Sequence, residues 1–355
     1  MKNNLRNGIA LSIIPQIIIV KWLAYHPDWV EANYSKGIYL WISTFFRTLF
    51  GWIPFSVGEI MYTSLILLGL RYIIKNRKKI KQFPLKFGRD VFLVLSVFYF
   101  TFHFVWGLNY YRKPISETLE IKNEATIEEI KTLAQELIVK TNELQFQITA
   151  DSNAIVKIPY SYDEVFEKTI AHYENLDAEM SFLEYKKPNI KKSIYSTASS
   201  YIGISGYLNP FTNEAQVNHT IPLFRYTVVS AHEIGHQIGY SAENETNLIG
   251  YLVTLKNDDI YFKYSAYAYA LNYCLSAINR TNKSEAKALY KSLNIGVQKN
   301  YQELIDHNEA YKTPIEPVFE FVFNTFLKAN SQEDGIKSYG KVVSLLVGYH
   351  EKYPL

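Results

Sequence analysis

Two histidines and a glutamate are the residues of this sequence whose spacing is best suited to chemistry. His232 and His236 are four positions apart, and Glu233 follows the first of them. On an α-helix this spacing places both imidazole rings on one face, one turn apart. Two such rings can take two corners of a zinc tetrahedron, and the carboxylate can accept a proton from a water molecule in the open position. The pattern predicts a catalytic Zn²⁺ site with His232 and His236 as ligands and Glu233 as general base.

A catalytic zinc site needs a third protein ligand, and the segment after the motif offers two glutamates. Glu243 and Glu245 lie at the start of a helix that we expect over residues 241–255, about 200° apart around its axis, so only one can face the metal. Glu245 lies on the more apolar side of this helix. A carboxylate at such a position would need an explanation, and ligation of a metal is one. We favour Glu243 and keep Glu245 as the alternative. Glu243 shares its stripe with small or polar residues that permit close approach to the motif helix: Asn247, Gly250 and Thr254.

Composition narrows the class of protein. The net charge of +3 over 355 residues is too weak to indicate a nucleic-acid partner. The only cysteine is Cys274, which excludes an intrachain disulfide and a cysteine-based zinc site. The sequence leaves the oligomeric state open.

The first 111 residues are far more apolar than the rest and predict a membrane region. We expect about three transmembrane helices, near residues 8–24, 55–75 and 91–109. The first could instead be the core of a signal peptide, although no small-residue cleavage site follows it. Seven lysines and arginines lie within residues 75–89, and the positive-inside rule puts this loop in the cytoplasm. Residues 112–355 should then form an extracytoplasmic domain on the bacterial cytoplasmic membrane.

The second half predicts a predominantly helical α+β domain. Thr126–Glu129 and Ser161–Glu164 have the pattern of capping boxes at helix starts. Residues 202–208 and 215–218 look like two short strands around a turn. The fold we expect is N-terminal transmembrane helices, then helices with a small sheet just before the motif helix.

The motif followed by Glu243-x-x-x-Asn247 resembles the thermolysin-like zinc peptidases, the gluzincins. That resemblance implies a zincin-like domain, a glutamate ligand on a second helix and a residue at 247 that orients the first histidine. Asn247 stands where those peptidases usually have aspartate. The metzincin pattern matches through Gly239 but has Ala242 at the third ligand. The whole chain is similar to an uncharacterised bacterial family with three predicted membrane spans and an H-E-x-x-H domain.

Three further residues are weaker candidates for binding substrate. Glu214 lies in the segment before the motif, where zinc peptidases usually place the strand that pairs with an extended substrate. His219 and Tyr339 could donate to an oxyanion. The function we expect is a membrane-anchored zinc metallopeptidase that acts on a peptide or protein. The rivals are a non-catalytic envelope protein with a structural or relic zinc site, and a zinc amidase that acts on a cell-wall linkage.

Overall fold

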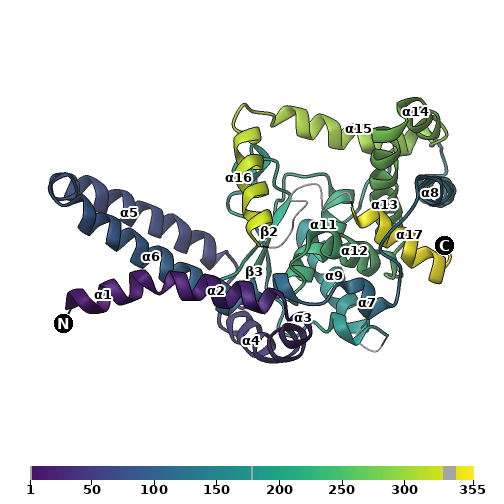
Figure 1. The fold of residues 1–355 in the computed structure, drawn as a ribbon. Coiled ribbons are helices and arrows are strands. Elements are labelled where there is room, and N and C mark those ends of the chain that lie inside the picture. The colour runs from purple at the N-terminus through teal and green to yellow at the C-terminus, as the bar shows by residue number, and fades with distance from the viewer. Residues whose placement is uncertain (1, 177–178, 331–340) are drawn as a thin grey trace.

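Three long apolar segments form a helical stem that projects from a mostly helical body (Figure 1). The computed structural model describes residues 2–176, 179–330 and 341–355. Each segment is long and apolar enough to cross a membrane, and most of its side chains are exposed. The predicted membrane region is therefore plausible by length and composition. The stem consists of α1 (Lys2–Leu11) with α2 (Ile13–Ala24), of α5 (Val57–Gln82) and of α6 (Pro84–Val105).

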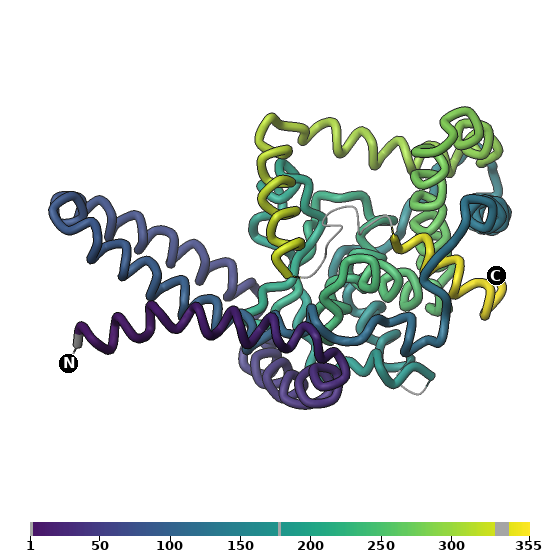
Figure 2. The backbone as a smooth tube through the Cα atoms, in the orientation of Figure 1, coloured from purple at the N-terminus to yellow at the C-terminus, as the bar shows by residue number. Residues whose placement is uncertain are grey.

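The basic segment at residues 75–89 is helical rather than a loop. Helix α5 continues to Gln82, and α6 begins at Pro84, so only Phe83 separates them. Lysine and arginine are good helix formers, and a proline is well suited to a first helical position. The second and third apolar segments thus form one antiparallel hairpin (Figure 2). The seven basic residues lie at and near its tip.

Between the stem helices, the chain folds against the body. This stretch contains α3 (Pro27–Trp29), a π-helical segment η1 (Val30–Ile38) and α4 (Tyr39–Phe50). The hydroxyl of buried Tyr39 donates to the carbonyl of Gln237, 2.7 Å away. The opposite side of α4 exposes large aromatic side chains, the kind that gather at membrane–water interfaces: Trp41 and Phe45.

A small sheet lies between the stem and the motif helix. Its strands are β1 (Ile190–Lys192), β2 (Gly206–Asn209) and β3 (Glu214–Val217), in the order β1-β3-β2. β3 pairs in parallel with β1 and antiparallel with β2, with Leu208 opposite Ala215. The two strands expected from the sequence are present, but β2 begins at Gly206, four residues later than expected, and β3 is shifted by one residue. β1 was not predicted, because three residues without clear alternation carry little signal.

Two buried glutamates attach the start of α5 to this sheet, and we call Glu59, Glu214 and Lys191 the anchor cluster. The Glu214 carboxylate accepts hydrogen bonds from the backbone N–H groups of Val57 and Gly58, 3.0 and 2.6 Å away, and from Lys191. Lys191 also donates to two backbone carbonyls. The Glu59 carboxylate accepts from Ser193, Ile194 and Tyr207. Buried hydrogen bonds therefore hold the start of the stem helix α5 against the sheet.

The body buries one large apolar core among its helices. The capping boxes predicted at Thr126–Glu129 and Ser161–Glu164 are both present. The body elements not yet named are η2 (Gly107–Tyr111), α7 (Ile115–Leu119), α8 (Ile127–Thr149), α9 (Tyr162–Leu176), η3 (Ser181–Leu183), α10 (Ser196–Ser200), α11 (Leu223–Gln237), α12 (Glu243–Leu255), α13 (Ile260–Thr281), α14 (Lys283–Lys291), α15 (Ile295–Ala310), α16 (Glu316–Ala329) and α17 (Val342–Lys352).

Candidate functional site

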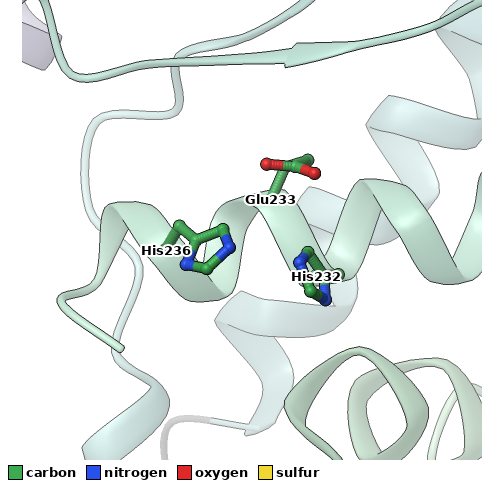
Figure 3. A group of neighbouring side chains, drawn as sticks. All are labelled: His232, Glu233 and His236. Carbon is green, nitrogen blue, oxygen red and sulfur yellow. The ribbon is translucent and has the colours of Figure 1, made fainter. Parts of the chain in front are cut away.

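The motif residues lie on α11, a helix whose ends are both encoded locally. Pro222 occupies the N-cap position, and Gly239 ends the helix with a φ of +95°, a conformation that favours glycine. The amide of Tyr240 then donates to the carbonyl of Gly235, 3.1 Å away, which closes the helix end. His232 and His236 project from one side of this helix, and Glu233 projects from the adjoining side (Figure 3). One nitrogen or oxygen atom from each lies within 4.8 Å of the others.

The turn after α11 also sets the orientation of His236. The chain reverses at Gly239, so that the Tyr240 carbonyl lies 2.7 Å from His236 Nδ1. With Nδ1 held by a carbonyl, Nε2 is left for a ligand, an arrangement typical of metal-binding histidines. The Trp106 indole, just after α6, donates to the His236 carbonyl at 3.0 Å. The residue that follows the stem helix α6 thus contacts the motif helix directly.

Glu243 brings a carboxylate to both histidines from the first turn of α12. Its Oε2 lies 3.4 Å from His232 Nε2 and 3.7 Å from His236 Nε2. The two helices approach closely at Gly250, where an added Cβ would lie 2.9 Å from the Val228 carbonyl oxygen. The small residue in the Glu243 stripe therefore permits the contact. We call His232, Glu233, His236 and Glu243 the His–Glu cluster.

Glu245 lies on the other side of α12. Its Oε1 accepts a hydrogen bond from the backbone N–H of Ile115 at 2.9 Å. Burial raises the pKa of Glu245 to about 7, although that N–H and nearby Arg112 oppose the rise. The structure places Glu243, and not Glu245, beside the histidines.

Glu233 faces the edge strand β2 at very short range. A Cβ added at Gly206 would lie 2.5 Å from Glu233 Oε1, so only glycine leaves room for this carboxylate. Glu233 Oε2 is buried and has no hydrogen-bond donor among the described residues. Burial raises the pKa of Glu233 to about 8.

The pKa values of the four side chains in the His–Glu cluster are shifted in different directions. Burial lowers the pKa of His232. It also disfavours charge on His236, but the Glu243 carboxylate outweighs it and raises the pKa of His236 to about 9. Burial opposes ionisation of Glu243, yet the two imidazoles hold its pKa well below the usual range. Glu243 is thus the anionic member of the cluster, and Glu233 has the pKa closest to neutrality among its acids.

Asn247 lies one turn beyond Glu243, beside two residues that the sequence analysis missed. Its Oδ1 accepts a hydrogen bond from Tyr269 at 2.6 Å, while its Nδ2 has no acceptor within the described chain. Arg225 stacks over the Tyr269 ring at 4.3 Å, and no described carboxylate pairs with it. Arg225 precedes His232 by seven residues, two helical turns, so this spacing could have revealed it. No comparable sequence signal marks Tyr269.

The His–Glu cluster lines a cavity of about 800 Å³. Strand β2 and Arg225 form part of its wall, and Phe319 and Phe323 of α16 form another part. At the far side the lining includes Tyr62 of α5 and Phe98 of α6. A volume of this size accommodates a segment of peptide or a small molecule.

The weaker candidates lie apart from this cavity or outside the described residues. Glu214 belongs to the anchor cluster, and its carboxylate is used at the start of α5. His219 Nδ1 lies 2.7 Å from the Ser196 hydroxyl, and neither residue belongs to the lining. Tyr339 lies outside the described residues.

Fold and site together define a mostly helical protein with an apolar stem and a buried His–Glu cluster at the floor of a cavity. The chain belongs to the family described as "Protein of unknown function (DUF3810)", which matches residues 34–347. The match includes α5, α6 and the cluster, and it begins after α1 and α2. No curated protein and no solved structure matches the chain.

Proposed function

We propose that this protein is a zinc-dependent peptidase anchored in a membrane by its stem. The observation that carries the proposal is the position of Glu243 Oε2, 3.4 and 3.7 Å from the Nε2 atoms of His232 and His236. Glu233, which follows His232, adds a carboxylate oxygen with no donor in the described chain. Two imidazoles, one carboxylate and a neighbouring general base are the components of a catalytic zinc site.

The residues fit a zinc ion by their chemistry. Glu233 Oε2 is buried without a hydrogen-bond donor among the residues described, and the cationic groups beside Glu243 Oε2 are the two imidazoles. A buried carboxylate oxygen without a partner is costly, and a cation would remove that cost. Imidazole nitrogen and carboxylate oxygen are common zinc ligands. His232, His236 and Glu243 would hold the ion.

In this proposal Glu233 transfers the proton, and strand β2 binds the substrate. Bound zinc would lower the pKa of a water molecule and polarise a carbonyl. Glu233 would accept a proton from that water and hand it to the leaving amine. β2 would pair with an extended peptide and so present a peptide bond to Glu233.

The cavity favours this function over the two rivals. A structural zinc site is closed by four protein ligands, whereas Glu233 contributes a carboxylate beside a cavity of about 800 Å³. An amidase for a cell-wall linkage would have no evident use for the unpaired side of β2, which pairs with β3 alone within the described sheet. Strand pairing is a general means of binding peptides.

The charges of the stem support an extracytoplasmic body on the cytoplasmic membrane. Arg6 lies 4.0 Å from Asp90 near the start of α6, so the N-terminal end of α1 is beside the basic hairpin tip. The positive-inside rule would place this end in the cytoplasm. A reporter fused after Leu355 should behave as extracytoplasmic, and one inserted near Gln82 as cytoplasmic. The reverse pattern would contradict this orientation.

Metal content and hydrolysis of the full chain, purified in detergent without chelators, test the proposal. We expect about one zinc per chain and hydrolysis of a mixed peptide library. His232→Ala and His236→Ala should remove both. His219→Ala is the matched control, because its ring lies outside the cavity, and it should retain both. Zinc that persists in a His232→Ala/His236→Ala double variant would refute the metal site.

A further inference from the structure

The cavity extends from the His–Glu cluster to the membrane stem. Besides the cluster, its lining includes Tyr62 of α5, and Phe98, Tyr99 and Phe102 of α6. All four belong to helices long and apolar enough to cross a membrane. Tyr62 is five residues into α5, and Phe98 is seven residues before the end of α6, about 8 and 10 Å from the body at 1.5 Å per residue. The cavity therefore extends to the part of the stem that would enter the lipid.

Helix α16 lines this cavity and has an apolar outer surface. Phe319, Phe323 and Phe326 line the cavity, and Phe326 contacts Phe102 of α6 with ring centroids 5.9 Å apart. On the outside, Phe321 is 72% exposed and Val318 63%. Figure 1 shows α16 at the end of the body nearest the stem, running across the direction of the hairpin. A helix with this orientation and outer surface is suited to lie in the membrane interface.

Strand β2 connects the two ends of the cavity. At one end, Gly206 lies against the Glu233 carboxylate. Two residues after β2 ends, the Phe211 ring packs on two stem residues. The distance between ring centroids is 5.1 Å to Phe98 of α6 and 6.3 Å to Tyr62 of α5. The four residues of β2 span about 13 Å at roughly 3.3 Å per residue. A peptide paired with β2 would thus run from Glu233 to the stem.

We propose that the substrate is a polypeptide with an apolar membrane-embedded segment, and that it is cleaved about four to six residues from the point where it enters lipid. This inference rests on the proposed peptidase function and adds the substrate class. An anchor that continues as polypeptide fits better than an acyl chain, because aromatic side chains from three helices line the stem end of the cavity, and a helical turn presents more apolar surface to them than a single acyl chain does. The aromatic side chains of α5, α6 and α16 would hold the first turn of the apolar segment.

Cleavage by the full chain in lipid vesicles tests the inference with three probes. Each carries the same short randomised stretch: one is joined to a leucine-rich segment of about twenty residues, one to a palmitoyl chain, and one to no anchor. The two anchored probes share the same membrane surface, so effective concentration does not separate them. We expect the polypeptide-anchored probe to be cleaved about tenfold faster than the palmitoyl probe, a difference of about 1.4 kcal/mol. The cut site should stay at a fixed distance from the anchor when a Gly-Ser spacer is inserted.

A matched pair of variants locates the binding surface. Phe98 and Phe100 lie on the same helix with similar exposure, 53% and 56%, but only Phe98 lines the cavity. Phe98→Ala should remove most of the advantage of the polypeptide-anchored probe, and Phe100→Ala should leave it intact. Equal rates for all three probes, or faster cleavage of the palmitoyl probe, would overturn the inference.

Crosslinking separates failure of the inference from failure of the peptidase function. The Glu233→Gln variant is mixed with the polypeptide-anchored probe, which carries a photoreactive group in the first turn of its apolar segment. We expect crosslinks to the cavity side of α6 or α16. Crosslinks there without hydrolysis by the unaltered protein would support the binding site and contradict the peptidase. Hydrolysis without crosslinks would support the peptidase and overturn the inference.

Discussion

The anchor cluster and the His–Glu cluster are both groups of buried acids beside the same small sheet, but their hydrogen bonding differs. In the anchor cluster, Glu214 and Glu59 accept hydrogen bonds at both carboxylate oxygens. In the His–Glu cluster, Glu233 and Glu243 each have a buried oxygen that receives no donor from the described chain. The nearest cations to Glu243 are imidazoles, whose charge depends on protonation.

This difference distinguishes a structural acid from one that is available for chemistry. Buried carboxylates in proteins are almost always satisfied, so a satisfied cluster holds elements together. An unsatisfied acid in a cavity, with a strongly shifted pKa, is a candidate for binding or catalysis. Burial raises the pKa of Glu233 to about 8.

The largest expected effect is on turnover after Glu233→Gln. The amide keeps the size and burial of the side chain but cannot accept the proton, so hydrolysis should fall by about 10²- to 10⁴-fold. Zinc content should stay at about one per chain, because Glu233 is the base in this account and not a ligand. Full activity in this variant would contradict the proposed role of Glu233, whichever residues bind the metal.

Glu214→Gln should affect stability instead of chemistry. It leaves Lys191 buried without its carboxylate partner, and we expect a loss of about 3 kcal/mol in the free energy of unfolding. Activity per folded molecule should be unchanged. Denaturant unfolding in detergent measures the loss. Glu184→Gln is the control, because its exposed pair with Lys186 should contribute less than about 1 kcal/mol. An equal effect of the two variants would remove the distinction between the clusters.

Glu243→Gln and Glu245→Gln compare two buried glutamates of the same helix, α12, of which only Glu243 lies beside the histidines. Loss of the charged oxygen beside the two histidines should weaken zinc binding strongly, and titration with a competing chelator measures the change. Glu245→Gln should retain zinc, because its carboxylate faces the Ile115 amide. The opposite result would mean that α12 is rotated by about half a turn in the metal-bound protein.

The smallest expected effect is that of Asn247→Ala. Asn247 accepts a hydrogen bond from Tyr269 beside the cluster, and removal of such supporting contacts typically costs about 10- to 100-fold in metal affinity or activity. Tyr269→Phe should give a similar loss if the hydrogen bond is the cause. A normal Tyr269→Phe together with a deficient Asn247→Ala would assign the effect to the asparagine alone.

Local patterns in the sequence predicted much of this site. The i, i+4 spacing placed His232 and His236 on one helix, and the stripe of small and polar residues placed Glu243 toward them. Both arguments depend only on helical periodicity, which is local. The apolar segments were found by their length and composition, and the capping boxes by the spacing of their residues, which are also local signals.

The remaining features depend on contacts between distant parts of the chain. Trp106 donates to His236 across 130 positions, and Tyr39 to Gln237 across 198. Nothing near either aromatic residue marks its partner. The sequence also suggested a substrate role for Glu214, whose place in the anchor cluster depends on the start of α5, 156 residues earlier. The short strand β1 and the cavity wall contributed by α16 are likewise set by tertiary packing.

Zinc K-edge X-ray absorption of the full chain tests the central claim most directly, because it counts the ligands of the ion. The account predicts a shell of nitrogen and oxygen atoms only, at about 2.0–2.2 Å, with two imidazoles, one carboxylate and one exchangeable water. Glu243→Gln should change this shell, and Glu245→Gln and Glu214→Gln should not. Four protein ligands with no exchangeable water, or a protein that binds no zinc, would contradict the claim that the unsatisfied cluster is a catalytic metal site.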